Sequence, residues 1–138
     1  MRYYLDTNVL IFVLTRDYDN ISRNVEYILD DFSSRFYVSS VVVRELIHLY
    51  KSGDIEHKEL KSAKSLFDAM DKIGIEIVPM NKYHLLRYAS LETVTEHKDP
   101  NDYIIISQAI SDRIPIISSD SKFKEYARQG LELIFNKR

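Results

Sequence analysis

Short apolar runs alternate with longer segments of helical periodicity along the whole chain, and this alternation limits the folds open to it. Strand-like apolar runs occupy residues 2–5, 36–38, 75–78, 115–117 and 131–135. Helix-like spacing occupies residues 8–14, 21–32, 40–51, 54–73, 81–91, 100–113 and 121–128. Strands separated by helices favour a parallel sheet, because each helix carries the chain back across it. The sequence therefore predicts an α/β sandwich with a central, mostly parallel sheet of about five strands.

Residues at the ends of the expected helices support these boundaries. Ser40 is a suitable cap for the helix over 40–51. The glycines at 53, 74 and 130 follow expected helices, where glycine commonly ends a helix. In the segment 54–73 we expect four side chains to point inward, namely Leu60, Ala63, Phe67 and Met70.

Length and composition fit one globular domain. The chain has 138 residues, of which 45% are hydrophobic and 29% charged, and it has no linker-like tract. We therefore expect residues 1–138 to form a single domain. The absence of cysteine excludes disulfide scaffolds and thiol catalysis. No apolar stretch approaches the roughly 20 residues that cross a bilayer, and Asp6 arrives too early for a secretion signal, so we expect a soluble, cytoplasmic protein.

Carboxylates occur where the expected strands end and the next helices begin. Asp6 and Asp120 directly follow strands, and Glu45 lies one to two turns into the helix after residues 36–38. Asp99 and Asp102 bracket the start of the helix over 100–113. Ligands of open α/β sheets bind beyond the carboxyl ends of the strands, and Mg²⁺ prefers oxygen ligands. This pattern predicts a divalent-metal site suited to phosphodiester hydrolysis.

Each of these acids also has a simpler structural explanation. Asp99 with Pro100 after it is a good helix start, and Asp120 could equally cap the helix over 121–128. Glu45 could be a solvated helical residue. Asp6 is harder to explain in this way, because an acid between apolar Leu5 and Val9 needs a partner or a metal.

Four motifs in order along the chain resemble the PIN-domain family, and in particular its VapC-like toxins. They are residues 4–10 (YLDTNVL), 39–46 (SSVVVREL), 97–109 (HKDPNDYIIISQA) and 116–123 (IISSDSKF). Together they span nearly the whole chain, and each one is weak alone. The family's fold is a three-layer sandwich with a central parallel sheet flanked by helices, which agrees with the pattern above.

The resemblance also implies roles for individual residues. The acidic catalytic and metal site would comprise Asp6, Glu45, Asp102 and Asp120, with Asp99 as the additional acid of one branch of the family. Donors that orient carboxylates or water would be Thr7, Asn8 and Ser118. The chain departs from the family at Asn101, where an aromatic is frequent, at Ser107, where a small apolar residue is usual, and at Ser118, where Thr is commoner.

The implied function is an endoribonuclease that uses Mg²⁺ or Mn²⁺, acts as the toxin of a toxin–antitoxin pair, binds a cognate antitoxin and forms a homodimer. The formal net charge of −2 argues against RNA binding by bulk charge. Individual phosphate contacts are instead expected from cations near the acids, namely Arg44, Lys98, Lys122 and Lys124. Two alternatives stay open: a PIN-like domain that binds RNA or protein without cleaving, and a housekeeping RNA-processing nuclease.

Two further enzyme classes fit the sequence less well. A haloacid-dehalogenase-type phosphatase would need a second acid two positions after the first, and that position holds Asn8. Glu45 and His48 have the Glu-x-x-His spacing of di-iron bundles, which need two copies, and the chain has one.

Overall fold

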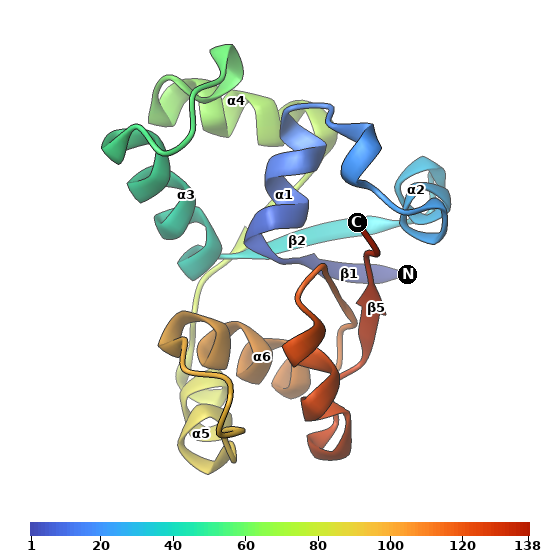
Figure 1. The fold of residues 1–138 in the computed structure, drawn as a ribbon, viewed down its shortest axis with the longest axis vertical. Helices are drawn as coiled ribbons and strands as arrows, with labels where there is room; N and C mark the ends of the chain where they lie inside the picture. The colour runs from blue at the N-terminus through green and yellow to red at the C-terminus, as the bar shows by residue number, and fades with distance from the viewer.

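The fold is an α/β structure with a central sheet between two layers of helices (Figure 1). The computed structural model describes the backbone of residues 1–138 and every side chain except that of Glu59. Its strands are β1 (Arg2–Leu5), β2 (Arg35–Ser39), β3 (Glu76–Val78), β4 (Ile116–Ser118) and β5 (Leu133–Phe135). Its α-helices are α1 (Thr7–Leu14), α2 (Arg23–Asp30), α3 (Ser40–Ser52), α4 (Ala63–Ile73), α5 (Lys82–Ser90) and α6 (Pro100–Asp112). Short 3₁₀ segments are η1 (Tyr18–Asn20), η2 (Lys58–Leu60) and η3 (Ser121–Gln129).

The sheet has the strand order β3-β2-β1-β4-β5, and every adjacent pair of strands is parallel. The predicted fold class is therefore confirmed, and the sheet is wholly rather than mostly parallel. The chain runs outward from β1 to β2 and β3, then returns to the other side of β1 for β4 and β5. Such a reversal leaves a crevice at the carboxyl ends of the two strands where it occurs. Here those strands are β1 and β4.

Helices cover both faces of this sheet. In Figure 1, α1, α3 and α4 lie on one side, while α5, α6 and η3 lie on the other. The two central strands are apolar on both faces, because Tyr4, Leu5, Ile116 and Ile117 are all buried. Burial on both faces is the usual consequence of helices packed on each side of a parallel sheet.

Most of the expected elements are found within one to three residues of their predicted ends. One cap is shifted: Ser39, not Ser40, caps α3, with its Oγ accepting from the Val41 N–H at 3.1 Å. Glycine ends α3 and α4 as expected, since Gly53 and Gly74 adopt φ of 81° and 82°, values that an L side chain adopts only with strain. In the described chain, no helix has both the length and the apolar character needed to cross a bilayer.

The prediction of one helix over residues 54–73 is wrong. Ser62 forms a capping box with Ser65, so α4 begins at Ala63 and only the short η2 precedes it. Serine at such a position competes with a continuous helix by bonding to the backbone itself. The predicted inward face is also wrong at Phe67, which is 38% exposed, whereas Leu60 and Met70 are buried.

Candidate metal centre

The candidate site lies at the carboxyl ends of β1 and β4. Leu5 pairs with Ile117 in the register of these strands, and the Asp6 N–H donates to the Ile117 carbonyl at 3.0 Å. Asp6 therefore emerges next to the end of β4, and Asp120 follows that end two residues after Ser118. This is the place where the strand order reverses, which is where open α/β sheets bind their ligands.

Ser118 links the two aspartates that follow these strands. Its hydroxyl donates to Asp6 Oδ2 at 2.7 Å, and its Oγ accepts from the Asp120 N–H at 3.0 Å. Ser118 is fully buried. A buried hydroxyl with both partners engaged fixes the orientation of Asp6 relative to the start of the segment that carries Asp120.

Glu45 reaches the same region from α3. The Thr7 hydroxyl, at the start of α1, donates to Glu45 Oε2 at 2.7 Å. Thr7 is buried and Glu45 is partly buried. Helices α1 and α3 also contact each other, so this hydrogen bond ties Glu45 to the residue directly after Asp6.

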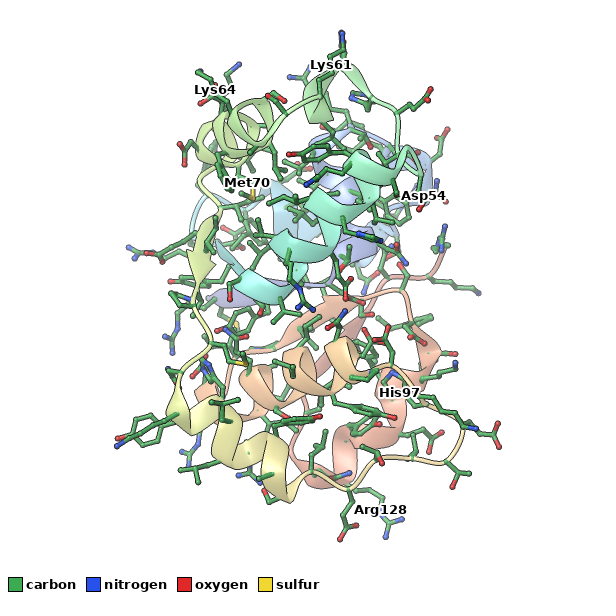
Figure 2. The ribbon with its side chains drawn as sticks, turned by 90° about the vertical axis from the view of Figure 1, so that its left-hand side faces the viewer. Asp54, Lys61, Lys64, Met70, His97 and Arg128 are labelled. Carbon is green, nitrogen blue, oxygen red and sulfur yellow. The ribbon has the colours of Figure 1, made fainter. Side chains whose placement is uncertain are left out.

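Asp102 lies in the first turn of α6 and is bonded to a histidine. Asp102 Oδ2 lies 2.9 Å from His97 Nε2. His97, Asp102 and Asp120 each offer one ligand atom, and these three atoms lie within 4.8 Å of one another. His97 belongs to the half of the molecule that contains α5, α6 and η3 (Figure 2). The sequence reasoning gave it no role, although it stands in the third motif.

Three of the acids also cap helices, as the simpler explanation expected for two of them. Asp6 Oδ1 accepts from the Thr7 N–H at 2.8 Å, Asp99 Oδ1 from the Asn101 N–H at 3.0 Å, and Asp120 Oδ1 from the Lys122 N–H at 2.9 Å. In each case the cap uses one carboxylate oxygen. Capping and metal binding are therefore compatible, because a carboxylate has a second oxygen with free lone pairs.

The acids are close enough to perturb one another's protonation. Burial, together with the negative charges of Asp6, Asp99, Glu45 and Asp120, raises the pKa of Asp102 to about 8. Burial also raises the pKa of Asp6 to about 6, against the lowering effect of the hydrogen bonds from Ser118 and Thr7. Five acids from four segments thus interact at one edge of the sheet.

This donor set fits a hard divalent cation. Carboxylate oxygens are the ligands that Mg²⁺ and Mn²⁺ prefer. Without a cation, burial and the negative charges of the neighbouring acids keep a proton on Asp102 near neutral pH, where its pKa is about 8. A bound divalent cation would remove the repulsion between these charges, because it reverses the local sign of the charge.

Asp99 faces a groove next to the acids rather than their centre. It is exposed, and with Glu45, Arg44 and Asn101 it lines a hollow of about 490 Å³ between α3 and the start of α6. The Arg44 guanidinium closes one side of this groove by donating from Nη2 to Asn101 Oδ1 at 2.7 Å. The groove joins the candidate metal site directly, because Glu45 belongs to both.

The remaining predicted residues are placed less centrally. Asn8 is exposed on α1, and its side chain makes no hydrogen bond to an acid among the described side chains. Lys98 and Lys122 are exposed beside Asp99 and Asp120 in sequence. The charge of Lys122 acts on His97, whose pKa is lowered mainly by burial. Lys124 lies with Nζ 4.0 Å from the ring centre of Phe135 on β5.

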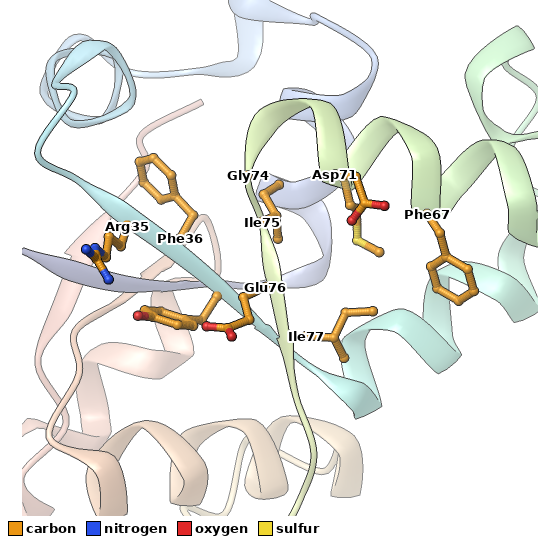
Figure 3. Close-up of a pocket in the computed structure, with 10 residues that line it drawn as sticks. Arg35, Phe36, Phe67, Asp71, Gly74, Ile75, Glu76 and Ile77 are labelled. Carbon is orange, nitrogen blue, oxygen red and sulfur yellow. The ribbon is translucent and has the colours of Figure 1, made fainter.

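A larger hollow, of about 680 Å³, lies elsewhere on the molecule. It is lined by residues of β2, β3 and α4, including Phe67 and Ile77, at the β3 edge of the sheet (Figure 3). None of the candidate metal-site acids lines it. The larger hollow is therefore separate from the acidic site.

Comparison with known proteins identifies the family. The model of the PIN domain matches residues 3–129, so the chain belongs to the PIN domain family. This confirms the resemblance inferred from the four motifs. The chain is 26% identical over 132 residues to Ribonuclease VapC2 of Rickettsia felis, covering 93% of this chain and 92% of that protein.

Solved structures of VapC-containing complexes share the fold. The structure of VapBC2 from Rickettsia felis bound to a promoter DNA fragment superposes with a TM-score of 0.76 at 23% identity, covering 99% of this chain and 100% of that one. The structure of VapBC-1 from nontypeable Haemophilus influenzae gives 0.70 at 19% identity, covering 98% of each chain. At these identities the likeness to the solved structures shows the shared fold.

Proposed function

We propose that this protein is a divalent-metal-dependent endoribonuclease that hydrolyses RNA phosphodiester bonds. The observation that carries the proposal is the convergence of Asp6, Glu45, Asp102 and Asp120 at the reversal point of the sheet. These are the residue types and the position that metal-dependent phosphodiester hydrolysis requires. Membership of the PIN domain family and similarity to a protein named as a ribonuclease support the same activity.

In this proposal Asp6, Glu45, Asp102 and Asp120 hold Mg²⁺ or Mn²⁺, with Asp99 at the rim. The bound cation supplies Lewis-acid activation of water and neutralises charge on the scissile phosphate. Ser118 and Thr7 keep Asp6 and Glu45 in fixed orientations through the hydrogen bonds described above. Loss of such a supporting hydrogen bond typically lowers metal affinity or activity by about 10- to 100-fold.

The RNA would be held by the groove beside the acids and by nearby cations. Arg44 lines the groove and offers a guanidinium to a phosphate or a base edge. Lys98, Lys122 and Lys124 follow or precede acids in sequence and are further candidates for phosphate contacts. Helices α1 and α6 both begin at the site, and the positive ends of helix dipoles favour bound anions.

The biological role that we propose is that of the toxin in a toxin–antitoxin pair. Support comes from the similar solved structures, which are of VapBC and other toxin–antitoxin complexes. We accordingly propose a cognate antitoxin partner, a homodimer, a single domain over residues 1–138 and a cytoplasmic location.

The activity is tested with purified protein and a labelled RNA. Cleavage should require added Mg²⁺ or Mn²⁺, stop with EDTA, and be lost in Asp6→Asn and Asp102→Asn. The matched control is Asp68→Asn, which changes an exposed acid paired with Lys64 on α4, and it should cleave normally. Unchanged cleavage by both site variants would contradict the site assignment. If the wild type cleaves with neither metal, the result would favour the alternative of a PIN-like domain that binds RNA or protein without cleaving it.

The toxin role needs a cellular test. Induced expression of the wild type should arrest growth, whereas Asp102→Asn should not. Co-expression of the short reading frame next to the gene should relieve the arrest. An active nuclease that leaves growth unaffected would favour a housekeeping RNA-processing role.

A further inference from the structure

His97 is a buried histidine beside the acids that the proposed function does not use. It precedes α6 and is 1% exposed. Both of its ring nitrogens have partners: Nδ1 lies 2.9 Å from the Tyr126 hydroxyl, and Nε2 lies 2.9 Å from Asp102 Oδ2. Tyr126 is fully buried and belongs to η3, the segment that Asp120 caps. The pair therefore connects the segment carrying Asp120 to the helix carrying Asp102.

The hydrogen bonds around Tyr126 and His97 run in one consistent direction. The Val94 N–H donates to the Tyr126 oxygen at 3.4 Å, which leaves the Tyr126 proton for His97 Nδ1. The His97 ring then carries its own proton on Nε2 and donates it to Asp102 Oδ2. With a cation bound, Asp102 would be ionised, and the opposite tautomer would then direct the Nε2 lone pair at a carboxylate, which is repulsive.

The imidazole is also fixed by its packing. The rings of Tyr103 and Tyr126 meet it edge to face, with centroids 5.2 Å and 5.4 Å away, and the Phe123 ring lies at 5.9 Å. The Tyr103 hydroxyl additionally donates to the His97 backbone carbonyl. A ring held on several sides and bonded at both nitrogens has one available orientation.

A histidine at this place could act in two ways: as a direct metal ligand or as a donor that orients Asp102. One of its ring nitrogens lies near enough to Asp102 and Asp120 for the three residues to share a cation. However, Nε2 points at Asp102 Oδ2 at hydrogen-bond distance, and Tyr126 favours the tautomer in which Nε2 is protonated. A protonated Nε2 has no lone pair for a metal, so the geometry favours the donor role.

We propose that His97 is a positioning residue: anchored by Tyr126, it donates its Nε2–H to Asp102 Oδ2 and so presents the other Asp102 oxygen to the metal. The inference rests on the proposed metal site. In this inference the Tyr126–His97 pair orients the Asp102 carboxylate by a hydrogen bond, as Ser118 orients the Asp6 carboxylate.

The test measures Mn²⁺ binding by electron paramagnetic resonance, which does not depend on RNA cleavage. His97→Phe keeps an aromatic ring and removes the donor, and it should weaken Mn²⁺ binding about 10-fold. Tyr126→Phe removes only the anchor and should weaken binding about 3-fold. His97→Gln, whose amide N–H can occupy the place of Nε2–H, should recover most of the affinity. The matched control is Tyr83→Phe at an exposed tyrosine of α5, which should bind as the wild type does.

Two further measurements separate positioning from ligation and from loss of structure. If His97 acts through Asp102, the His97→Phe change should add little to the loss already caused by Asp102→Asn, which a double-mutant cycle reports. Electron spin echo spectra of the Mn²⁺-loaded wild type should show no directly bonded imidazole nitrogen. This spectrum and the Tyr126→Phe variant decide the question even if His97→Phe does not fold.

Three results would overturn the inference. These are wild-type Mn²⁺ affinity in both His97→Phe and Tyr126→Phe, a directly coordinated nitrogen in the echo spectrum, or additive losses in the double-mutant cycle. Any of them would leave the proposed ribonuclease activity standing. A wild type that binds no Mn²⁺ would instead overturn the metal site and this inference together.

Discussion

The Ser118 hydroxyl donates a hydrogen bond to Asp6 Oδ2 at 2.7 Å, across 112 positions of sequence. Asp6 Oδ1 is already used by the Thr7 N–H at the start of α1. The carboxylate of Asp6 is therefore held at both oxygens by groups from two adjacent strand ends. A buried carboxylate held in this way has a defined orientation before any metal arrives, which lowers the reorganisation that binding requires.

Ser118→Ala should weaken Mn²⁺ binding about 10-fold, because it removes this donor and leaves the Asp120 N–H without its Oγ acceptor. The Ser118 hydrogen bond lowers the pKa of Asp6, so the loss should be greater at pH 6 than at pH 8. Isothermal titration at the two pH values measures the effect. Ser118→Thr keeps the hydroxyl and should recover binding, and an alanine variant with wild-type affinity at pH 6 would contradict the prediction.

The metal-free protein should become less stable as pH rises. The pKa of Asp6 is raised to about 6 and that of Asp102 to about 8, whereas an aspartate in an unfolded chain titrates near about 3.9. The folded state therefore binds these protons more tightly. The stability they contribute is present at low pH and is lost as pH rises through about 6 and then about 8.

Thermal unfolding in EDTA, compared between the wild type and Asp102→Asn, isolates the Asp102 contribution. Near pH 9 the asparagine variant should unfold about 3 °C or more above the wild type, and the difference should shrink toward pH 6. Added Mn²⁺ should raise the melting temperature of the wild type at high pH far more than that of the variant. A wild-type and variant difference that is constant with pH would show that Asp102 titrates normally.

The fold and most of the acidic site could be predicted from the sequence, and the reason is physical. Each strand is a short apolar run, and each candidate acid is tied to a strand end or a helix start, so parallel topology brings the acids to one edge. Asp6 and Asp120 illustrate this: the register that pairs Leu5 with Ile117 places both beyond the same end of the sheet. The capping roles of Asp99 and Asp120 were also visible, because capping depends on neighbours along the chain.

Contacts that depend on loop geometry could not be predicted from the sequence. His97 meets Asp102 across a loop and a helix start, and Tyr126 reaches it from η3, so no periodicity marks the trio. The misplaced Phe67 has a similar cause. Treating residues 54–73 as one continuous helix fixed the wrong inward face, whereas the Ser62–Ser65 capping box begins a new helix with its own phase.

Arg44→Ala should weaken RNA binding without changing metal affinity. Arg44 lines the groove beside Glu45 and Asp99, where its guanidinium can meet a phosphate. Losing one such contact should raise the dissociation constant several-fold and reduce the slope of log K against log salt by about 0.7, the value for one phosphate contact on a single strand. Fluorescence anisotropy with the Asp102→Asn background, at several salt concentrations, measures both quantities. Arg87→Ala on α5 is the control at another exposed arginine, and an Arg44 variant that matches it would remove Arg44 from the RNA surface.

A second buried polar cluster should contribute to stability and not to cleavage. Asp112, the last residue of α6, accepts from the Tyr4 hydroxyl at 2.5 Å, and both of its oxygens lie 2.9 Å from His84 Nε2. His84 Nδ1 accepts from the Asn81 N–H, so the His84 proton lies on Nε2 and points to Asp112. Tyr4 and His84 are buried, and the cluster therefore joins β1, α5 and α6.

Asp112→Ala would leave two buried donors without an acceptor, at a cost of about 2–4 kcal/mol in the free energy of unfolding. Tyr4→Phe removes one donor but leaves Asp112 bonded to His84, and it should cost about 1 kcal/mol. Urea unfolding measures both, with Tyr83→Phe at an exposed tyrosine as the control. Asp112 lies at the other end of α6 from Asp102, about 15 Å along the helix, so RNA cleavage below the unfolding transition should stay within about twofold of the wild type. An Asp112→Ala variant as stable as the wild type would mean that water replaces the carboxylate, because the 27% exposure of the Asp112 side chain leaves a route for it.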